Sequence, residues 1–328
     1  MFRRITLAAC LVCALLFTSF GEGIVFGQTM EFALITKSVV NPGWVVMKGA
    51  GEAAAKDLGI KLTYYAPTKP DNVLEQISIM ENLIQRKVNC IVLVPADSQG
   101  IIPGIEKANQ AGIPVVTANT KAFGGKIVSH VGATNYEGAY ESAKYLIQNL
   151  GGKGDVIILE GVPGSSVAME RKKGFDDAVK ENPGIKVLVS QTARFQRKIG
   201  MEVMENLLQR FAKFDGLMCA NDEMALGAIQ AIKASGRMGQ IKIASFDGVV
   251  DDATEAVARG EILVTVDQNT MAQAYWGVVA GYVYIKGHSL VPKYIPISSL
   301  LMTKNDVRAW LVSRWKDPDK WLKERGLQ

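Results

Sequence analysis

The stretch that decides the fold of this chain is ANDEMALGA, residues 220–228. It follows an apolar run, residues 214–219, that predicts a short buried strand. It also begins a segment in which apolar residues such as Met224 and Ile232 recur at helical spacing, which predicts a helix. Asn221 therefore lies where the carboxyl end of a strand meets the amino end of a helix. At such a junction its side chain can cap the helix, or face a ligand in the crevice where open α/β sheets bind.

The same alternation of strand and helix continues along the chain. Short apolar runs predict strands, and segments with helical periodicity follow most of them. Continuous apolar strands alternating with helices are typical of parallel, doubly wound sheets. Because one sheet holding all these strands would be unusually wide, the sequence favours two similar α/β lobes. The expected strands are Phe32–Thr36, Lys61–Ala66, Cys90–Val94, Pro114–Thr117, Ile127–Val131, Val156–Leu159, Lys186–Val189, Leu217–Cys219, Ile241–Ala244, Ile262–Val266 and Ile295–Met302.

Three local signals concern helices. Pro42 fits the first position of a helix, where its missing N–H costs nothing. Asp71 precedes a segment with an apolar face, and we expect it to cap that helix. Residues 49–51, Gly-Ala-Gly, mimic a dinucleotide-binding fingerprint. Since they lie inside a helix rather than directly after a strand, we interpret them as helix packing.

The first 27 residues are expected to be a secretory signal peptide. Arg3 and Arg4 precede an uncharged, mostly apolar run over residues 5–20, and residues 25–27 suit cleavage. That run is too short and too early for a transmembrane helix. No second apolar run of membrane length follows, so we expect an exported protein.

The composition argues against several function classes. A formal net charge of +5 over 328 residues, with no basic cluster between aromatic residues, does not indicate a nucleic-acid partner. Cys90 and Cys219 are expected to be buried and free, with a disulfide as the alternative, and they make no metal site. His130 and His288 lie in unrelated contexts, and the chain lacks HExxH, GxSxG and P-loop motifs. We therefore expect a protein that is not an enzyme and needs neither a cofactor nor a metal.

Polar side chains follow the carboxyl ends of many predicted strands. Amides and carboxylates at these positions can each bind two neighbouring hydroxyl groups. Aromatic residues near two strand ends offer faces that pack against the C–H side of a sugar ring, and an arginine adds a planar fork of donors. Together they favour a polyhydroxylated ligand. The candidates are Lys37, Asn41, Asn119, Thr120, Asn221, Asp247 and Gln268, with the aromatic residues Trp44 and Phe195 and the arginine Arg171.

Each candidate also has an ordinary structural interpretation. Asn41 and Asn221 can be helix caps, and Asp247 a turn residue before a glycine. Trp44 and Phe195 can belong to the core, while Arg171 and Lys37 can be solvated surface charges. The collective pattern favours a binding site.

With these residues in view, the chain resembles the periplasmic sugar-binding proteins of ABC importers, in particular the ribose-binding-protein-like branch. The resemblance runs from about Glu31 to Met302, and ANDEMALGA is its most specific part. Asn41-Pro42, MERKKGF at 169–175, ARFQ at 193–196, FDG at 246–248 and Gln268 follow in the same order. The resemblance implies that ligand is held at the positions of Asn41, Trp44, Arg171, Phe195, Asn221, Asp247 and Gln268.

Two departures from the ribose-binding pattern concern the ligand. Ribose binders carry an Asp-Arg pair where this chain has Asn119-Thr120, so a charged acceptor and an arginine fork are missing. They also carry two aromatic residues after Asn-Pro, whereas the first of these is Gly43 here, which opens space beside the ring. A larger or differently substituted sugar, or a cyclic or linear polyol, is favoured over ribose.

The resemblance also implies a type I periplasmic binding protein, with two doubly wound lobes joined by a three-crossing hinge. We expect lobe 1 to comprise residues 28–132 and 267–295, and lobe 2 residues 133–266 and 296–328. Such a protein captures its ligand by hinge closure in the periplasm and delivers it, as a monomer, to the permease of an ABC transporter.

Three alternatives remain open. An enzyme acting on a sugar would show turnover. The effector domain of a sugar-responsive repressor would need a helix-turn-helix in place of the export signal. A sugar-sensing protein that serves a chemoreceptor or sensor kinase, or a binder of a furanosyl signalling molecule, shares every feature described above.

Overall fold

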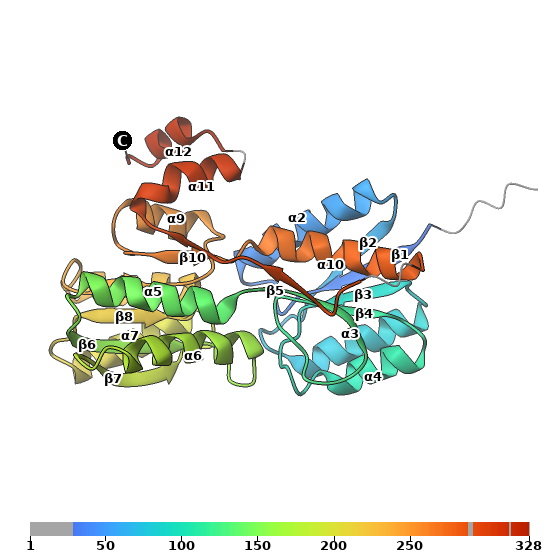
Figure 1. The fold of residues 1–328 in the computed structure, drawn as a ribbon, viewed down its shortest axis with the longest axis horizontal. Coiled ribbons are helices and arrows are strands. Elements are labelled where there is room, and N and C mark those ends of the chain that lie inside the picture. Colours follow the sequence, from blue (N-terminus) through green and yellow to red (C-terminus); the bar gives the residue numbers. More distant parts are fainter. Residues whose placement is uncertain (1–28, 288–290, 315, 328) are drawn as a thin grey trace, which may run out of the picture. The chain divides into compact units, whose positions relative to one another are not determined.

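The structure is a computed structural model in which residues 29–287, 291–314 and 316–327 are described. The segment Glu31–Gln328 forms one compact unit. The expected signal peptide, residues 1–27, lies outside the described residues. The architecture confirms the predicted α/β class, with parallel sheets covered by helices (Figure 1).

The first lobe is built on a six-stranded sheet in the order β11-β5-β4-β3-β1-β2, in which neighbouring strands pair in parallel. Helices α2 and α10 pack together, as do α3 and α4. Along the sheet, the chain moves one way from β1 to β2 and the other way from β2 to β3 and from β3 to β4. Right-handed crossovers therefore place α2 on one face of the sheet and the α3–α4 pair on the other. The elements are β1 Glu31–Ile35, α2 Pro42–Asp57, β2 Lys61–Tyr65, α3 Val73–Gln85, β3 Cys90–Leu93, α4 Ile102–Gln110, β4 Val115–Ala118, β5 Ile127–Ala133, α10 Thr270–Ile285 and β11 Tyr294–Ile297.

The second lobe contains a four-stranded parallel sheet in the order β7-β6-β8-β9 and a short antiparallel pair, β10 and β12. Helices α5 and α6 pack together, and so do α7 and α8. A carboxyl-terminal pair of helices, α11 and α12, follows β12 (Figure 1). The elements are α5 Asn135–Asn149, β6 Gly154–Glu160, α6 Ser166–Lys180, β7 Ile185–Thr192, α7 Arg197–Arg210, β8 Gly216–Cys219, α8 Asp222–Ala234, β9 Lys242–Ala244, α9 Asp251–Ala258, β10 Thr265–Asp267, β12 Leu300–Met302, α11 Val307–Ser313 and α12 Pro318–Glu324.

The chain passes between the two lobes three times. It leaves the first sheet after β5, returns between β10 and α10, and leaves again between β11 and β12. The predicted strand Ile295–Met302 is therefore two strands in different sheets, a correction to the sequence analysis. Ser298 and Ser299 interrupt its apolar pattern at the crossing, where the Ser299 N–H donates to Thr134 Oγ1 at 2.9 Å.

Of the two predicted helix starts, the one at α2 is confirmed and the cap predicted for α3 is wrong. Asn41 caps α2 and Pro42 takes its first position. Asp71, expected to cap α3, does not do so: Asn72 accepts the Glu75 N–H at 3.1 Å instead. Asp71 has a positive φ of 61°, and its side chain makes a different contact, described below.

The predictions for the buried cysteines and for the Gly-Ala-Gly segment also have outcomes. Cys90 and Cys219 are free and buried, and burial raises the pKa of both thiols. Residues 49–51 lie inside α2, where a Cβ on Gly51 would meet Leu34 and Leu62 at 3.0 Å. The close approach of helix and sheet explains that glycine.

Glycines explain part of two motifs. A Cβ on Gly227, within ANDEMALGA, would lie 2.0 Å from the Arg197 backbone oxygen, where α8 packs on α7. A Cβ on Gly174, within MERKKGF, would lie 2.5 Å from the Tyr136 backbone oxygen, where α6 packs on α5. Both contacts are with backbone, which cannot rotate away.

Gly227→Ala is expected to lower the free energy of unfolding by about 1–3 kcal/mol, because the added methyl group forces α7 and α8 apart. Urea denaturation measures the change. Gly49→Ala is the matched control: Gly49 lies in α2 with nothing within 4 Å of its Cβ position. This control should gain about 0.5–1 kcal/mol. Equal stability of the two variants would contradict the packing argument.

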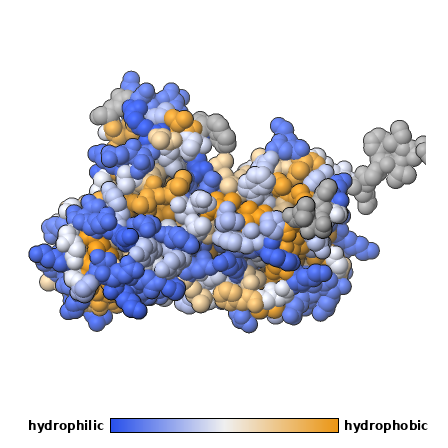
Figure 2. Space-filling model, viewed as in Figure 1, coloured by the Kyte–Doolittle hydropathy of each residue, from blue (hydrophilic) through white to orange (hydrophobic). Residues whose placement is uncertain are grey.

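In Figure 2 hydrophilic residues cover much of the visible face, and hydrophobic residues form separate patches. Across the described ranges, we find no helix with the length and apolarity needed to cross a bilayer.

Candidate functional site

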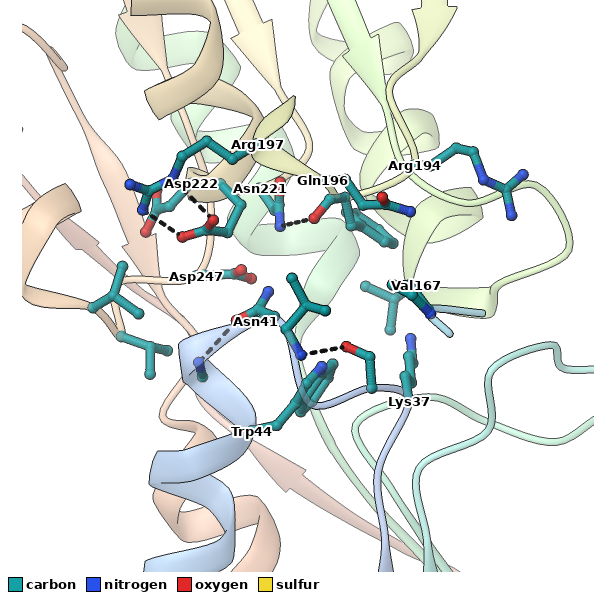
Figure 3. Close-up of a pocket in the computed structure, with 18 of the residues that line it drawn as sticks. Lys37, Asn41, Trp44, Val167, Arg194, Gln196, Arg197, Asn221, Asp222 and Asp247 are labelled. Atoms are coloured by element: carbon teal, nitrogen blue, oxygen red, sulfur yellow. Dashed lines mark hydrogen bonds and ion pairs between the residues drawn. The ribbon is translucent and has the colours of Figure 1, made fainter. Parts of the chain in front are cut away.

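A cavity of about 470 Å³ lies at the carboxyl ends of strands from both lobes. Figure 3 shows Lys37, Asn41 and Trp44 on one side of it, facing Asn221 and Asp247 on the other. In each sheet the order of the strands reverses at one point near this edge. Open α/β sheets bind ligands beside such a reversal, at the carboxyl ends of the strands. The sequence-predicted residues that line it are Lys37, Asn41, Trp44, Asn119, Arg171, Phe195, Asn221, Asp247 and Gln268.

Arg171 is the centre of the polar network. It projects from α6, is 1% exposed, and stacks on Phe246 with 3.7 Å between its Cζ atom and the ring centroid. One Nη1 donates to the Ala220 backbone oxygen at 2.7 Å and to Asp247 Oδ1 at 2.9 Å. Nη2 donates to Gln268 Oε1 at 3.0 Å. These bonds hold the guanidinium in one orientation.

Asp247 forms an isolated parallel β-bridge with Asp267, and its φ of 128° is an unusual conformation for a residue with a side chain. Its Oδ1 accepts from Arg171 and from Gln268 Nε2, the latter at 2.6 Å. The following glycine, Gly248, leaves no room for a Cβ, which would lie 2.5 Å from the Asp267 Cα atom. Burial raises the pKa of Asp247, and the positive charge of Arg171 opposes that shift.

Asp222 supports the segment that contains Asp247 and Gly248. Its Oδ1 accepts from Ser245 Oγ at 2.6 Å and from Thr265 Oγ1 at 2.7 Å, and its Oδ2 accepts the Gly248 N–H at 2.8 Å. Burial, with the negative charge of Asp247 in addition, raises the pKa of Asp222. The Asp of ANDEMALGA therefore connects α8 to the segment that carries Asp247.

Asn41 and Asn221 combine the two roles that the sequence left open. Asn41 Oδ1 accepts the Gly43 N–H at 2.8 Å, and Asn221 Oδ1 accepts the Met224 N–H at 3.0 Å, so both cap helices. Both also line the cavity. Their capping bonds use the oxygen atoms, which leaves the amide nitrogens on the cavity side as donors, although Asn221 Nδ2 also reaches the Phe195 backbone oxygen at 3.3 Å.

Lys37 lies between two aromatic faces. Its Nζ atom is 5.9 Å from the Trp44 ring centroid and 5.8 Å from that of Phe195. The residue is only 5% exposed, and burial lowers the pKa of its ammonium group to about 8. Asp71 and Asp247 partly oppose this shift.

Asn119 is placed by other amides. Its Nδ2 donates to Gln268 Oε1 at 3.0 Å and to Gln273 Oε1 at 3.1 Å, which uses both N–H groups. Only its oxygen is left to face a ligand. Thr120 is fully buried, donates to that oxygen at 3.3 Å, and is not among the residues that line the cavity. A ligand contact by Thr120 stays a prediction without support from the cavity geometry.

The sequence analysis missed a pair that joins the two lobes across the cavity. Arg194 Nη2 lies 3.2 Å from Asp71 Oδ2, and both residues line the cavity. Arg194 and Phe195 have positive φ values of 55° and 58°, which are unfavourable for residues of these types. Arg194 was inside the quoted ARFQ motif, but nothing in the sequence places it near Asp71.

Other residues of the cavity wall were also not predicted as site residues: Val167, Gln196, Arg197, Lys198, Glu223 and Gln230. Several lie in or beside the motifs ARFQ and ANDEMALGA, so their closeness to predicted residues was a usable signal. No group of three His, Cys, Asp or Glu side chains within the described ranges is arranged to hold a metal ion.

Comparisons with known proteins agree with this geometry. The profile of the periplasmic binding protein domain matches residues 32–289. The ribose import binding protein RbsB of Haemophilus influenzae is 33% identical over 265 residues, which are 81% of this chain and 88% of that protein.

Two solved structures are similar over most of their length. One is an ABC transporter periplasmic solute-binding protein from Actinobacillus succinogenes with bound D-allose (30% identity, TM-score 0.81, covering 86% of this chain and 100% of that one). The other is the Caulobacter myo-inositol binding protein bound to myo-inositol (27% identity, TM-score 0.81, covering 86% and 96%). From its fold, its cavity and these matches, the chain belongs to the periplasmic binding protein family.

Proposed function

We propose that this protein is the periplasmic solute-binding protein of an ABC importer and that its ligand is a sugar or a sugar-like polyol. One observation carries the proposal: the cavity combines the pre-formed Arg171–Asp247–Gln268 network with the aromatic faces of Trp44 and Phe195. Hydroxyl groups need paired donors and acceptors, and sugar C–H faces need flat apolar surfaces. The relatives that contain D-allose or myo-inositol support the same ligand class.

The nine predicted residues that line the cavity are the proposed ligand-binding set, and hinge closure is the proposed mechanism. In the proposed boundaries, residues 28–132 and 267–295 form lobe 1, and residues 133–266 and 296–328 form lobe 2. The strand pairings support these boundaries to within a few residues, since Asp267 pairs with Leu300 in the second lobe. Ligand captured on one lobe is then enclosed by Arg171 and Asp247 of the other, which excludes water.

The proposed partner is the permease of the transporter, which receives the ligand from the closed form. Delivery by a monomer is part of the proposal. A sensing role through a chemoreceptor is a second possible use of the same closed form, since closure itself is the signal that either partner reads.

A thermal-shift screen tests the function. We expect a pentose, hexose, sugar acid or polyol, present at about 100 times its Kd, to stabilise the protein by about 2.7 kcal/mol. Absence of a shift with every compound, or chemical conversion of a compound that binds, would overturn the proposed function. Amino acids of similar size serve as the negative control.

A further inference from the structure

The charges on the cavity wall are matched with one exception. Four cations that line the cavity each have a carboxylate at ion-pair distance: Arg171 with Asp247 at 2.9 Å, Arg194 with Asp71 at 3.2 Å, Arg197 with Glu223 at 2.8 Å, and Lys198 with Glu202 at 3.7 Å. Lys37 is the remaining cation of the wall, and within the described ranges it has no such partner.

The two carboxylates whose charges act on Lys37 already have ion-pair partners. Asp71 and Asp247 both act on its charge, but each is paired with an arginine. The other two carboxylates of the wall are Asp222 and Glu223. Asp222 is 1% exposed and already accepts hydrogen bonds from Ser245, Thr265 and the Gly248 N–H. Glu223 is paired with Arg197 at 2.8 Å. None of them is free to neutralise the ammonium group.

The surroundings of Lys37 make that unmatched charge costly. Lys37 is only 5% exposed, and the rings of Trp44 and Phe195 flank it. A buried ammonium group is stable only when a charged or strongly polar partner replaces its water. Since the protein does not supply a carboxylate, the ligand is the remaining source.

Position 119 and position 43 add to this. The neutral Asn119 has both N–H groups directed to Gln268 and Gln273, so it contributes an acceptor without a negative charge. Gly43 also lines the cavity and brings no side chain into it. Neither position therefore adds a negative charge to the cavity wall.

We propose that the ligand is a sugar acid, a polyhydroxylated monoanion such as an aldonate or uronate, and that Lys37 binds its carboxylate. This inference rests on the proposed function and narrows its ligand class. One unmatched positive charge calls for one negative charge, which favours a carboxylate over a phosphate dianion.

Isothermal titration calorimetry at pH 7 on matched pairs tests the inference: galactose with galacturonate, glucose with gluconate, xylose with xylonate, and glucose 6-phosphate as the dianion. We expect the acid of at least one pair to bind about tenfold or more tightly than its neutral partner. Lys37→Met should remove that preference, and Lys48→Met, at an exposed lysine of α2 paired with Glu52, should keep it. A melting curve of each variant without ligand shows whether it is folded.

The outcomes separate the two proposals. Neutral sugars that bind as tightly as their acids, or a Lys37→Met variant that retains the acid preference, would overturn the sugar-acid inference and leave the proposed function standing. Tighter binding of the sugar phosphate would overturn the choice of carboxylate. Absence of binding by all compounds would overturn both.

Discussion

Arg171→Ala is expected to abolish ligand binding and to lower the free energy of unfolding by about 3–5 kcal/mol. Arg171 is 1% exposed and donates to Asn135, Ala220, Asp247 and Gln268. The substitution removes a donor from each of these groups and leaves Asp247 without its ion-pair partner. Urea denaturation measures the loss of stability, and calorimetry measures the loss of binding.

A double variant separates stability from binding. Arg171→Ala combined with Asp247→Ala removes both charges, so it should recover part of the stability that Arg171→Ala loses. It should recover no binding, because both groups are proposed to face the ligand. Lys172→Ala is the control: Lys172 is the next residue of α6, and its pair with Asp176 lies on the exposed side at i,i+4 spacing. That pair contributes only about 0.3–0.5 kcal/mol. Undiminished binding by Arg171→Ala would contradict the site assignment.

Lys37→Met is expected to make the ligand-free protein more stable at pH 7, by about 3 kcal/mol. Burial lowers the pKa of Lys37 from its ordinary 10.5 to about 8, with Arg171 adding to this and Asp71 and Asp247 opposing it. The folded protein therefore disfavours the charged form that the unfolded chain favours. Replacing the ammonium group with an apolar side chain between two rings removes that cost.

The lowered pKa of Lys37 also determines how the stability of the wild type changes with pH. Between pH 8 and pH 10.5 the unfolded chain holds a proton on Lys37 that the folded protein has released, so rising pH stabilises the wild type. The cost of the charge is fully present below about pH 8 and disappears toward pH 10.5. The stability difference between Lys37→Met and wild type should therefore be constant up to pH 8 and shrink above it. Urea denaturation at pH 7, 8, 9 and 10 measures it.

Lys48→Met, at an exposed position of α2, serves as the control and should show no such trend. A difference between Lys37→Met and wild type that grows with pH would contradict the burial argument. Substitutions at ligand-binding residues commonly raise the stability of a protein while they weaken its function.

The local features of this protein follow directly from its sequence. Most strands form from short stretches rich in apolar residues, and Asn41-Pro42 and Asn221 begin α2 and α8 as expected. Hydrophobic periodicity and helix capping act between near neighbours, so the sequence shows them. Since strand ends of a parallel sheet share one edge, the same patterns also predicted nine residues that line the cavity.

What only the tertiary structure decided depends on distant parts of the chain. Asp71 faces Arg194 across 123 positions of sequence, and Ile295–Met302 divides between two sheets because it crosses from one lobe to the other. The unpaired charge of Lys37 also depends on the tertiary structure, because a sequence shows which side chains are charged but not which of them form ion pairs. Pairing is set by where two lobes meet, and the packing of whole sheets and helices determines that.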